Sequence, residues 1–196
     1  TISVGPSGGG TEALAKATLV HLGIIQGQTT WKNEGLQEGL ANLRSGETDV
    51  VCVVTGIGNP LLGKVLAEGG LQLLSLGDEP AAGLAYSYPF VKPVTIPAAA
   101  YPVAPGKGVP AKSLASVGVK VILACSKSLD EADALELVTA LFENRVALSR
   151  SKALMARMSA PDEHLVLQFP THEGARQYYE RDAPSFLQNW SEPISF

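Results

Sequence analysis

A glycine-rich turn near the N-terminus carries the groups best suited to bind a ligand. The sequence GPSGGGT, residues 5–11, lies between a short apolar segment and an amphipathic helical segment. Backbone N–H groups at the start of a helix, together with the positive end of its dipole, attract small anions, and neighbouring hydroxyl groups add further donors. We therefore predict an anion-binding site made by Ser7, Gly8, Gly9, Gly10 and Thr11. The alternative is an ordinary tight turn.

The order of the glycines indicates which kind of anion would fit. A phosphate-binding loop has a lysine directly after its glycines, and a dinucleotide-binding turn has the order G-x-G-x-x-G. Residues 5–11 have neither feature. A carboxylate or another small anion therefore fits this turn better than a nucleotide.

A second glycine turn, TGIGNP at residues 55–60, follows an apolar run at residues 50–54. Open α/β sheets bind their ligands at the carboxyl ends of the strands. We expect the two turns to line one crevice, with additional ligand contacts from Thr55, Gly56, Asn59 and Tyr101. The alternatives are that Asn59 only caps the next helix and that Tyr101 packs against the surrounding chain.

No catalytic or metal-binding constellation is visible in the residue spacing. His21, His164 and His172 are far apart and lack the spacing of metal ligands, and no nucleophile motif occurs. We therefore expect no metal, no cofactor and no enzymatic activity. An enzyme on the same scaffold remains the rival hypothesis, with His172, Glu173 and Asp78 as its candidate acid, base or nucleophile.

The two cysteines, Cys52 and Cys125, both lie in strongly apolar stretches. Free cysteine is among the residue types most often buried. We predict that both are buried small hydrophobic residues, and a disulfide between them stays open as an alternative.

The hydrophobic pattern predicts an α/β fold. Over the first 77 residues, strands at 2–4, 50–54 and 71–76 alternate with helices at 11–22, 34–44 and 61–68. This order is typical of a largely parallel sheet flanked by helices. Residues 78–112 form an irregular, proline-rich connection with one extended piece at 94–96. A strand at 117–124, a helix capped by Ser128, two short helices and an aromatic tail follow.

Composition excludes some classes of partner. The chain of 196 residues has 15 Lys and Arg against 19 Asp and Glu, a net charge of -4. This balance supplies no basic field for a nucleic acid. No apolar run approaches the ~20 residues that a membrane-spanning helix needs.

The order of several segments resembles a known family. The segments GPSGGGTEALAKATLVHLGI, LRSGETDVVCVVTGIGNPLLGKVLAEGGLQLLSL, YPFVKPVTIPAAAYP, LVTALFEN and FPTHEGARQYYERDAP are similar, in this order, to segments of the TAXI branch of solute receptors for TRAP transporters. These receptors are bilobed periplasmic binding proteins. The resemblance covers most of the chain, and the order of the motifs carries it.

The resemblance implies a periplasmic-binding-protein-like architecture with an incomplete first lobe. It places the second lobe at residues 1–97, a hinge connection at 98–112 and the remainder of the first lobe at 113–196. It implies a periplasmic or otherwise extracytoplasmic receptor, with any membrane anchor outside this segment. The receptor would bind a small organic anion, such as an amino acid or another carboxylate, and present it to a membrane transporter or a signalling protein.

Two departures from the family pattern shape these expectations. The family's usual Gly-Ser-Gly-Thr is replaced by Gly8-Gly9-Gly10-Thr11, so a hydroxyl donor is either missing or supplied by Ser7. The family's usual His-Pro-Gly-Ala is replaced by His172-Glu173-Gly174-Ala175. The front part of the first lobe has no counterpart here. The remaining apolar surface would favour a homodimer, and a degenerate module that only binds other proteins is a further alternative.

Overall fold

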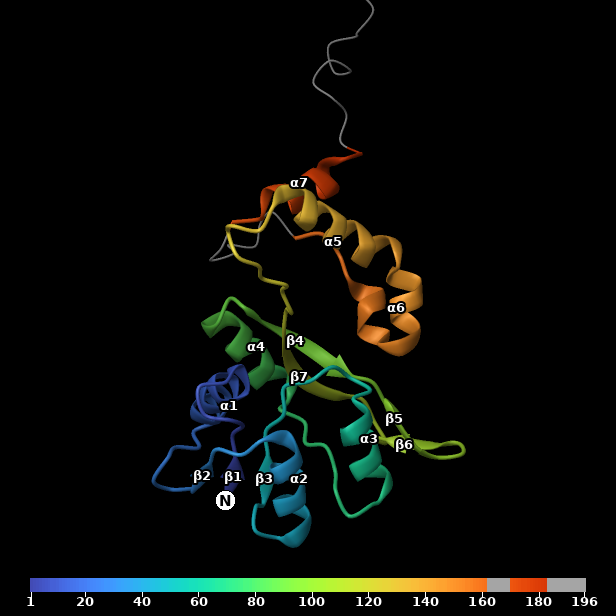
Figure 1. Cartoon of the computed structure of the whole chain (residues 1–196). Coiled ribbons are helices and arrows are strands. Elements are labelled where there is room, and N and C mark those ends of the chain that lie inside the picture. The colour runs from blue at the N-terminus through green and yellow to red at the C-terminus, as the bar shows by residue number, and fades with distance from the viewer. Residues whose placement is uncertain (162–169, 183–196) are drawn as a thin grey trace, which may run out of the picture. The chain divides into compact units, whose positions relative to one another are not determined.

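The computed structural model describes residues 1–161 and 170–182, which form two compact units (Figure 1). The N-terminal unit is Thr1–Val121, and the C-terminal unit is Ile122–Phe196. Strands occur in the N-terminal unit, whereas the described part of the C-terminal unit is helical.

A three-stranded parallel sheet with the order β2-β1-β3 forms the base of the N-terminal unit. Its strands are β1 (Ile2–Ser3), β2 (Trp31–Lys32) and β3 (Val50–Val51). Ile2 pairs with Trp31 on one side and with Val50 on the other. Because the strands are parallel, all three carboxyl ends meet at one edge of the sheet.

Side-chain alternation along β1 determines which helix covers each face. Ile2 and Val4 pack against Ala15 and Leu19 of helix α1 (Gly10–His21). Ser3 points to the opposite face, towards helix α2 (Leu36–Ser45). Gly39 allows α2 to approach closely there, since a Cβ built on Gly39 would lie 3.0 Å from Ser3 Oγ.

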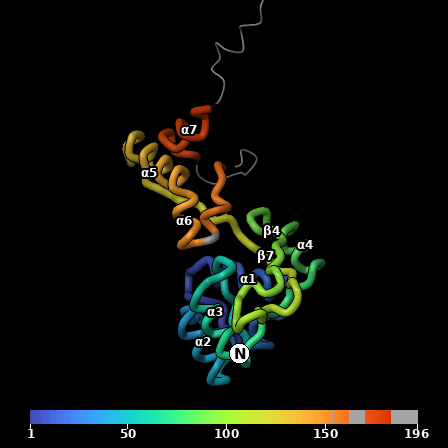
Figure 2. The backbone as a smooth tube through the Cα atoms, turned by 90° about the vertical axis from the view of Figure 1, so that its right-hand side faces the viewer, coloured from blue at the N-terminus to red at the C-terminus, as the bar shows by residue number. Residues whose placement is uncertain are grey.

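The remainder of the N-terminal unit combines two helices with two antiparallel ladders. Helix α4 (Asp78–Ser87) packs on the ladder of β4 (Val91–Ile96) and β7 (Leu114–Val119), as Figures 1 and 2 both show. Helix α3 (Pro60–Ala67) packs against β5 (Tyr101–Ala104), and β5 forms a hairpin with β6 (Lys107–Val109).

Some predicted elements of this unit are wrong. Residues 71–76 form no strand, because Leu71 and Leu73 pack into the core beside α3 instead of joining a ladder. Residues 78–112 are not an irregular connection, since they contain α4, β4, β5 and β6. Pro80 lies in the first turn of α4, where a missing N–H group leaves no helical hydrogen bond unmade.

The C-terminal unit consists of α5 (Glu131–Glu143), α6 (Arg145–Ser151), a 3-10 helix (Ala153–Arg157) and α7 (Glu173–Glu180). Asp130, rather than Ser128, caps α5, and its side chain accepts from the N–H of Ala132 at 2.8 Å. Helices α5 and α7 pack closely at Gly174, where any Cβ would overlap the carbonyl oxygen of Glu131.

The strand predicted at 117–124 ends earlier, at Val119, and Cys125 is exposed. The prediction of a buried Cys125 is therefore wrong, because the apolar run before it joins no ladder among the described residues. Cys52 is partly buried beside the core of the sheet, and burial raises the pKa of its thiol. His164 and the aromatic tail lie outside the described residues.

The parallel sheet flanked by helices confirms the predicted mixed α/β class. Within residues 1–161 and 170–182, no helix is both long and apolar enough to cross a membrane. Residues 113–121, predicted to open the first lobe, group with the N-terminal unit through the pairing of β7 with β4. The assignment of receptor lobes and a hinge to these segments stays a prediction.

Candidate functional site

A small cleft of about 50 Å³ opens beside the carboxyl ends of the parallel strands. We name it the strand-end cleft. It is lined by Ser3, Gly5, Pro6, Thr11, Glu34, Gly35, Leu36, Val51, Cys52, Val53 and Val54. These residues come from the ends of β1 and β3 and from the turns that precede α1 and α2. The cleft therefore lies where open α/β sheets bind their ligands.

Two helices begin beside the strand-end cleft without a side-chain cap. Helix α1 follows Gly9, and α2 follows Gly35, and neither glycine can supply a capping oxygen from its side chain. Among the described residues, the N–H groups that open the two helices have no acceptor: Gly10, Thr11 and Glu12 in α1, and Leu36, Gln37 and Glu38 in α2. Uncapped N–H groups and the positive ends of two helix dipoles favour an anion in this place.

Not every N–H group of the first glycine turn is free for a ligand. The Gly8 N–H donates to Glu12 Oε2 at 2.7 Å, and the Gly9 N–H donates to the carbonyl of Pro6 at 3.1 Å. The N–H groups of Gly10 and Thr11 remain open. Of the five residues predicted in this turn, only Thr11 lines the strand-end cleft, whereas Ser7, Gly8, Gly9 and Gly10 do not.

The carboxylate of Glu12 is held by three donors. Its oxygens accept from Lys16 Nζ at 2.7 Å, from Asn33 Nδ2 at 2.9 Å and from the Gly8 N–H. These partners, the Lys16 ammonium first, lower the pKa of Glu12 from 4.5 to about 2. The charge of Glu12 is thus compensated within the turn, which reduces its repulsion of an anion at the helix start.

Gly5 and Thr11 fit tightly together at the mouth of the strand-end cleft. Gly5 has a φ of +91°, and a Cβ built there would lie 2.6 Å from Thr11 Cγ2. Glycine is required at this position for both reasons. The turn holds Thr11 at the cleft through the contact of its methyl group with Gly5.

The second glycine turn has a capping role. Asn59 Oδ1 accepts from the N–H groups of Leu61 and Leu62 at 2.9 and 3.1 Å, which caps α3. Asn59 Nδ2 donates to Thr55 Oγ1 at 2.8 Å. The strand-end cleft is lined by Val53 and Val54, directly before Thr55, and its lining does not include Thr55, Gly56 or Asn59.

Tyr101 lies in the hydrophobic core. It is 4% exposed and packs with Leu40, Leu62, Val65 and Leu66. Burial raises the pKa of its phenol, and a backbone hydrogen bond with Gly58 acts in the opposite direction. Tyr101 is the first residue of β5, its ring packs against α3, and it does not line the strand-end cleft.

Of the residues that line the strand-end cleft, sequence reasoning identified Thr11 alone, and those that it missed include Ser3, Glu34 and Gly35. Ser3 carries one signal, since it is a polar residue inside an apolar strand. Glu34 and Gly35 carry another, because a glutamate and a glycine directly precede the apolar period of α2. Neither signal identifies a cleft without knowledge of which segments meet.

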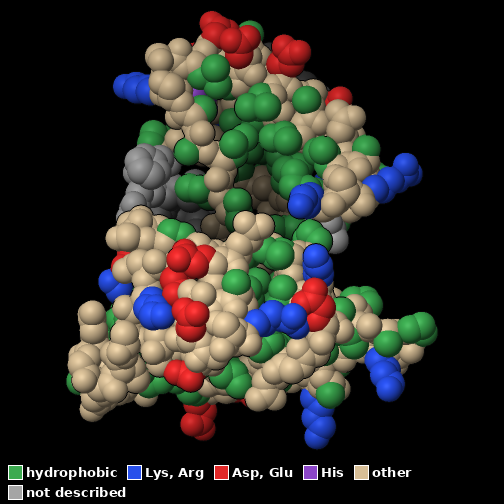
Figure 3. Space-filling model, turned by 60° about the horizontal axis from the view of Figure 1, so that its bottom comes forward, with side chains coloured by type: hydrophobic (Ala, Val, Ile, Leu, Met, Phe, Trp, Pro, Cys, Tyr) green, Lys and Arg blue, Asp and Glu red, His purple; other side chains and the backbone are tan. Residues whose placement is uncertain are grey.

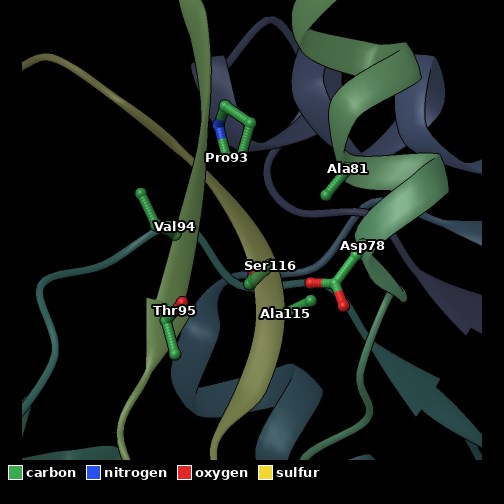
Figure 4. Close-up of a pocket in the computed structure, with 7 residues that line it drawn as sticks. All are labelled: Asp78, Ala81, Pro93, Val94, Thr95, Ala115 and Ser116. Atoms are coloured by element: carbon green, nitrogen blue, oxygen red, sulfur yellow. The ribbon is translucent and has the colours of Figure 1, made fainter.

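The N-terminal unit also has a larger hollow of about 120 Å³, between α4 and the β4–β7 ladder. Figure 4 shows Asp78 and Ala81 extending from α4 towards β7. Among its lining residues only Asp78 is charged, and Asp78 is exposed. Helix α4 begins at this hollow without a side-chain cap, but it is a single helix start with an exposed carboxylate on it, and no buried polar side chain lines the hollow. We therefore place the candidate site at the strand-end cleft, where two helix starts meet.

The histidines that the structure describes have structural contacts. His172 caps α7, because its Nδ1 accepts from the Gly174 N–H at 3.3 Å and its Nε2 lies 3.1 Å from the carbonyl of Leu129. His21 packs against Gly83 of α4. No cluster of His, Cys, Asp and Glu suited to a metal occurs in the part of the chain that the structure describes.

Surface charges of both signs are interspersed on the face of the N-terminal unit that Figure 3 presents. Hydrophobic side chains gather on the C-terminal unit in the same view. The exposed apolar residues of that unit include Leu137, Val146 and Leu154. The presented face of the N-terminal unit has no single-sign field of the kind that attracts nucleic acids.

A known family model matches most of the chain. The model of the NMT1-like family, which is periplasmic-binding-protein-like, matches residues 1–181. No curated protein matches the chain. Membership of the narrower TAXI group is not established by this match.

Proposed function

The chain belongs to the NMT1-like family of binding proteins, and from this premise we propose that it is a receptor for a small organic anion. The anion binds in the strand-end cleft, with its carboxylate between the N-termini of α1 and α2. The N–H groups of Thr11 and Leu36, two residues that line the cleft, donate to the carboxylate, and the Thr11 hydroxyl adds a further donor. No bond of the ligand is made or broken.

One observation carries this proposal. Two helices that begin at Gly10 and Leu36 both lack a side-chain cap, and both begin beside the same cleft at the carboxyl edge of a parallel sheet. A single uncapped helix is commonplace, since water can satisfy its N–H groups. Two that converge with the hydroxyl of Thr11 provide a preorganised set of donors for a carboxylate.

The partner and the location of the receptor belong to the same proposal, and the family match supports the location. Binding-protein families of this kind typically act outside the cytoplasm. The resemblance to TAXI receptors supports a membrane transporter as the partner, with a signalling protein as the alternative. A homodimer belongs to the same proposal, and native mass spectrometry tests it directly.

Native mass spectrometry and a thermal-shift screen of the chain test the proposed function together. The screen includes small monocarboxylates, dicarboxylates and amino acids, with inorganic sulfate and an uncharged amide as controls. A ligand that binds the folded state stabilises it by about 2.7 kcal/mol at a concentration of 100 Kd. We expect a co-purified acid, or a rise in melting temperature with a carboxylate but not with the amide.

An absence of any shift across the screen, with no co-purified acid, contradicts the proposed function. That result favours the alternative in which this chain only binds other proteins. A specific turnover of one of the screened acids, detected as a new mass, favours the enzyme hypothesis instead.

A further inference from the structure

The strand-end cleft contains two buried oxygens without a hydrogen-bond partner. Ser3 is 1% exposed and Glu34 is 6% exposed, and both residues line the cleft. Ser3 Oγ and Glu34 Oε2 have no partner among the described residues. A buried polar atom without a partner is costly, so it indicates a group that binds there.

The two oxygens border the same small space beside α2. A Cβ built on Gly39 would lie 3.0 Å from Ser3 Oγ and 3.5 Å from Glu34 Oε2. A side chain at residue 39 would crowd both oxygens, so glycine keeps this side of them clear. The other carboxylate oxygen, Glu34 Oε1, already accepts from Asn42 Nδ2 at 2.9 Å and lies 4.0 Å from Lys32 Nζ.

We propose that Glu34 and Ser3 bind the ammonium group of the ligand, so that the cleft prefers amino acids to the corresponding carboxylates without an amino group. This inference rests on the proposed function. The open N–H groups of α1 and α2 attract the carboxylate, whereas an ionised Glu34 repels it. A ligand with both charges can accept from the N–H groups of the helix starts and donate to Glu34 and Ser3 at the same time.

Chemistry favours an ammonium over a neutral donor at this position. An ammonium has three N–H donors, which matches a hydroxyl oxygen and a carboxylate oxygen with one donor to spare. A hydrogen bond between ionised partners is about twice as strong as a neutral one. A buried water molecule could supply two donors, but it carries no charge and would leave Lys32, 4.0 Å from Glu34 Oε1, as the cation that faces this carboxylate.

Calorimetry with matched probes tests the inference. The probes are L-alanine and propanoate, L-glutamate and glutarate, and L-phenylalanine and 3-phenylpropanoate, each pair differing only in the α-amino group. We expect the amino acid to bind at least 10-fold more tightly than its partner in the pair that binds best. The Glu34→Gln variant keeps an acceptor for Asn42, and we expect it to reduce that preference to under 3-fold.

Two further variants control for effects on folding. Ser3→Ala removes the hydroxyl alone and is expected to reduce the preference by a smaller factor. Glu38→Gln makes the same change of charge at an exposed position of α2, and it should leave the preference intact.

Each outcome separates the inference from the proposed function. If propanoate, glutarate or 3-phenylpropanoate binds as tightly as its amino acid, or if Glu34→Gln leaves the preference unchanged, the inference fails and the anion receptor stands. A buried water alone would then occupy the space beside Gly39. If no probe binds, the proposed function fails, and the inference fails with it.

Discussion

The carboxylate of Glu12 accepts a hydrogen bond from the backbone N–H of Gly8, 2.7 Å away, within the turn that begins α1. The protein therefore uses one of its own anions to satisfy part of this turn and leaves the N–H groups of Gly10 and Thr11 for a ligand. The first two predictions concern these two anions, the carboxylate of Glu12 and the carboxylate of a ligand.

The free energy of unfolding should decrease as the pH is lowered, and part of this decrease should come from protonation of Glu12. Its pKa is lowered from 4.5 to about 2 in the folded protein. The stabilisation by ionised Glu12 is complete above pH 4.5 and is lost progressively as the pH falls towards about 2. We expect Glu12→Gln to make the urea unfolding midpoint less dependent on pH in this window. Equal pH dependence in the wild type and the variant would contradict the assignment, and Glu38→Gln is the control.

Replacement of Thr11 tests the anion site. Thr11→Val keeps the methyl contact with Gly5 and removes the hydroxyl donor. The affinity for a bound carboxylate should therefore fall roughly 10-fold to 150-fold, as expected for loss of one hydrogen bond to a charged group. Thr11→Ser keeps the hydroxyl and should bind more tightly than Thr11→Val in calorimetry. Unchanged affinity in the valine variant would exclude the hydroxyl from the site.

The cap of α3 should be measurable by substitution of Asn59. Asn59→Ala removes the acceptor of two N–H groups and should lower the free energy of unfolding by about 1 kcal/mol. Asn59→Asp retains the acceptor and should preserve most of the stability in chemical denaturation. If the carboxylate ligand binds both variants with wild-type affinity, Asn59 acts as a cap and not as a ligand contact.

Two helical glycines provide a matched pair for the packing of helices. A Cβ at Gly174 would overlap the backbone of Glu131, whereas a Cβ at Gly83 would meet the end of the His21 side chain, which can move away. Gly174→Ala should therefore destabilise the α5–α7 contact by about 1–3 kcal/mol, and Gly83→Ala should cost less. Hydrogen exchange measures both effects, in the amides of α5 and α7 for Gly174→Ala and in those of α1 and α4 for Gly83→Ala, and an equal loss of protection in the two variants would refute the prediction.

Local sequence patterns correctly predicted much of the local structure. Short apolar runs predicted β1 and β3, and apolar residues at helical spacing predicted α1, α2, α3 and α5, to within a few residues of their bounds. Pro60 and Asn59 identified the start of α3, because their effects on a helix N-terminus are local. Helix α4 was missed, since Pro80 and Gly83 weaken the same local signals.

The sequence by itself determined the α/β class and the presence of a glycine turn that opens a helix, because both depend on residues that are neighbours along the chain. Only the tertiary structure decided which groups share the strand-end cleft. Strand β1 pairs with β2 and β3 over two residues each, and such short strands exist only through those partners. The pairing brings Ser3 close to Glu34 and Gly39, and it leaves Ser3 Oγ and Glu34 Oε2 without a hydrogen-bond donor among the described residues. Tyr101, in contrast, is buried in the core through its contacts with α3.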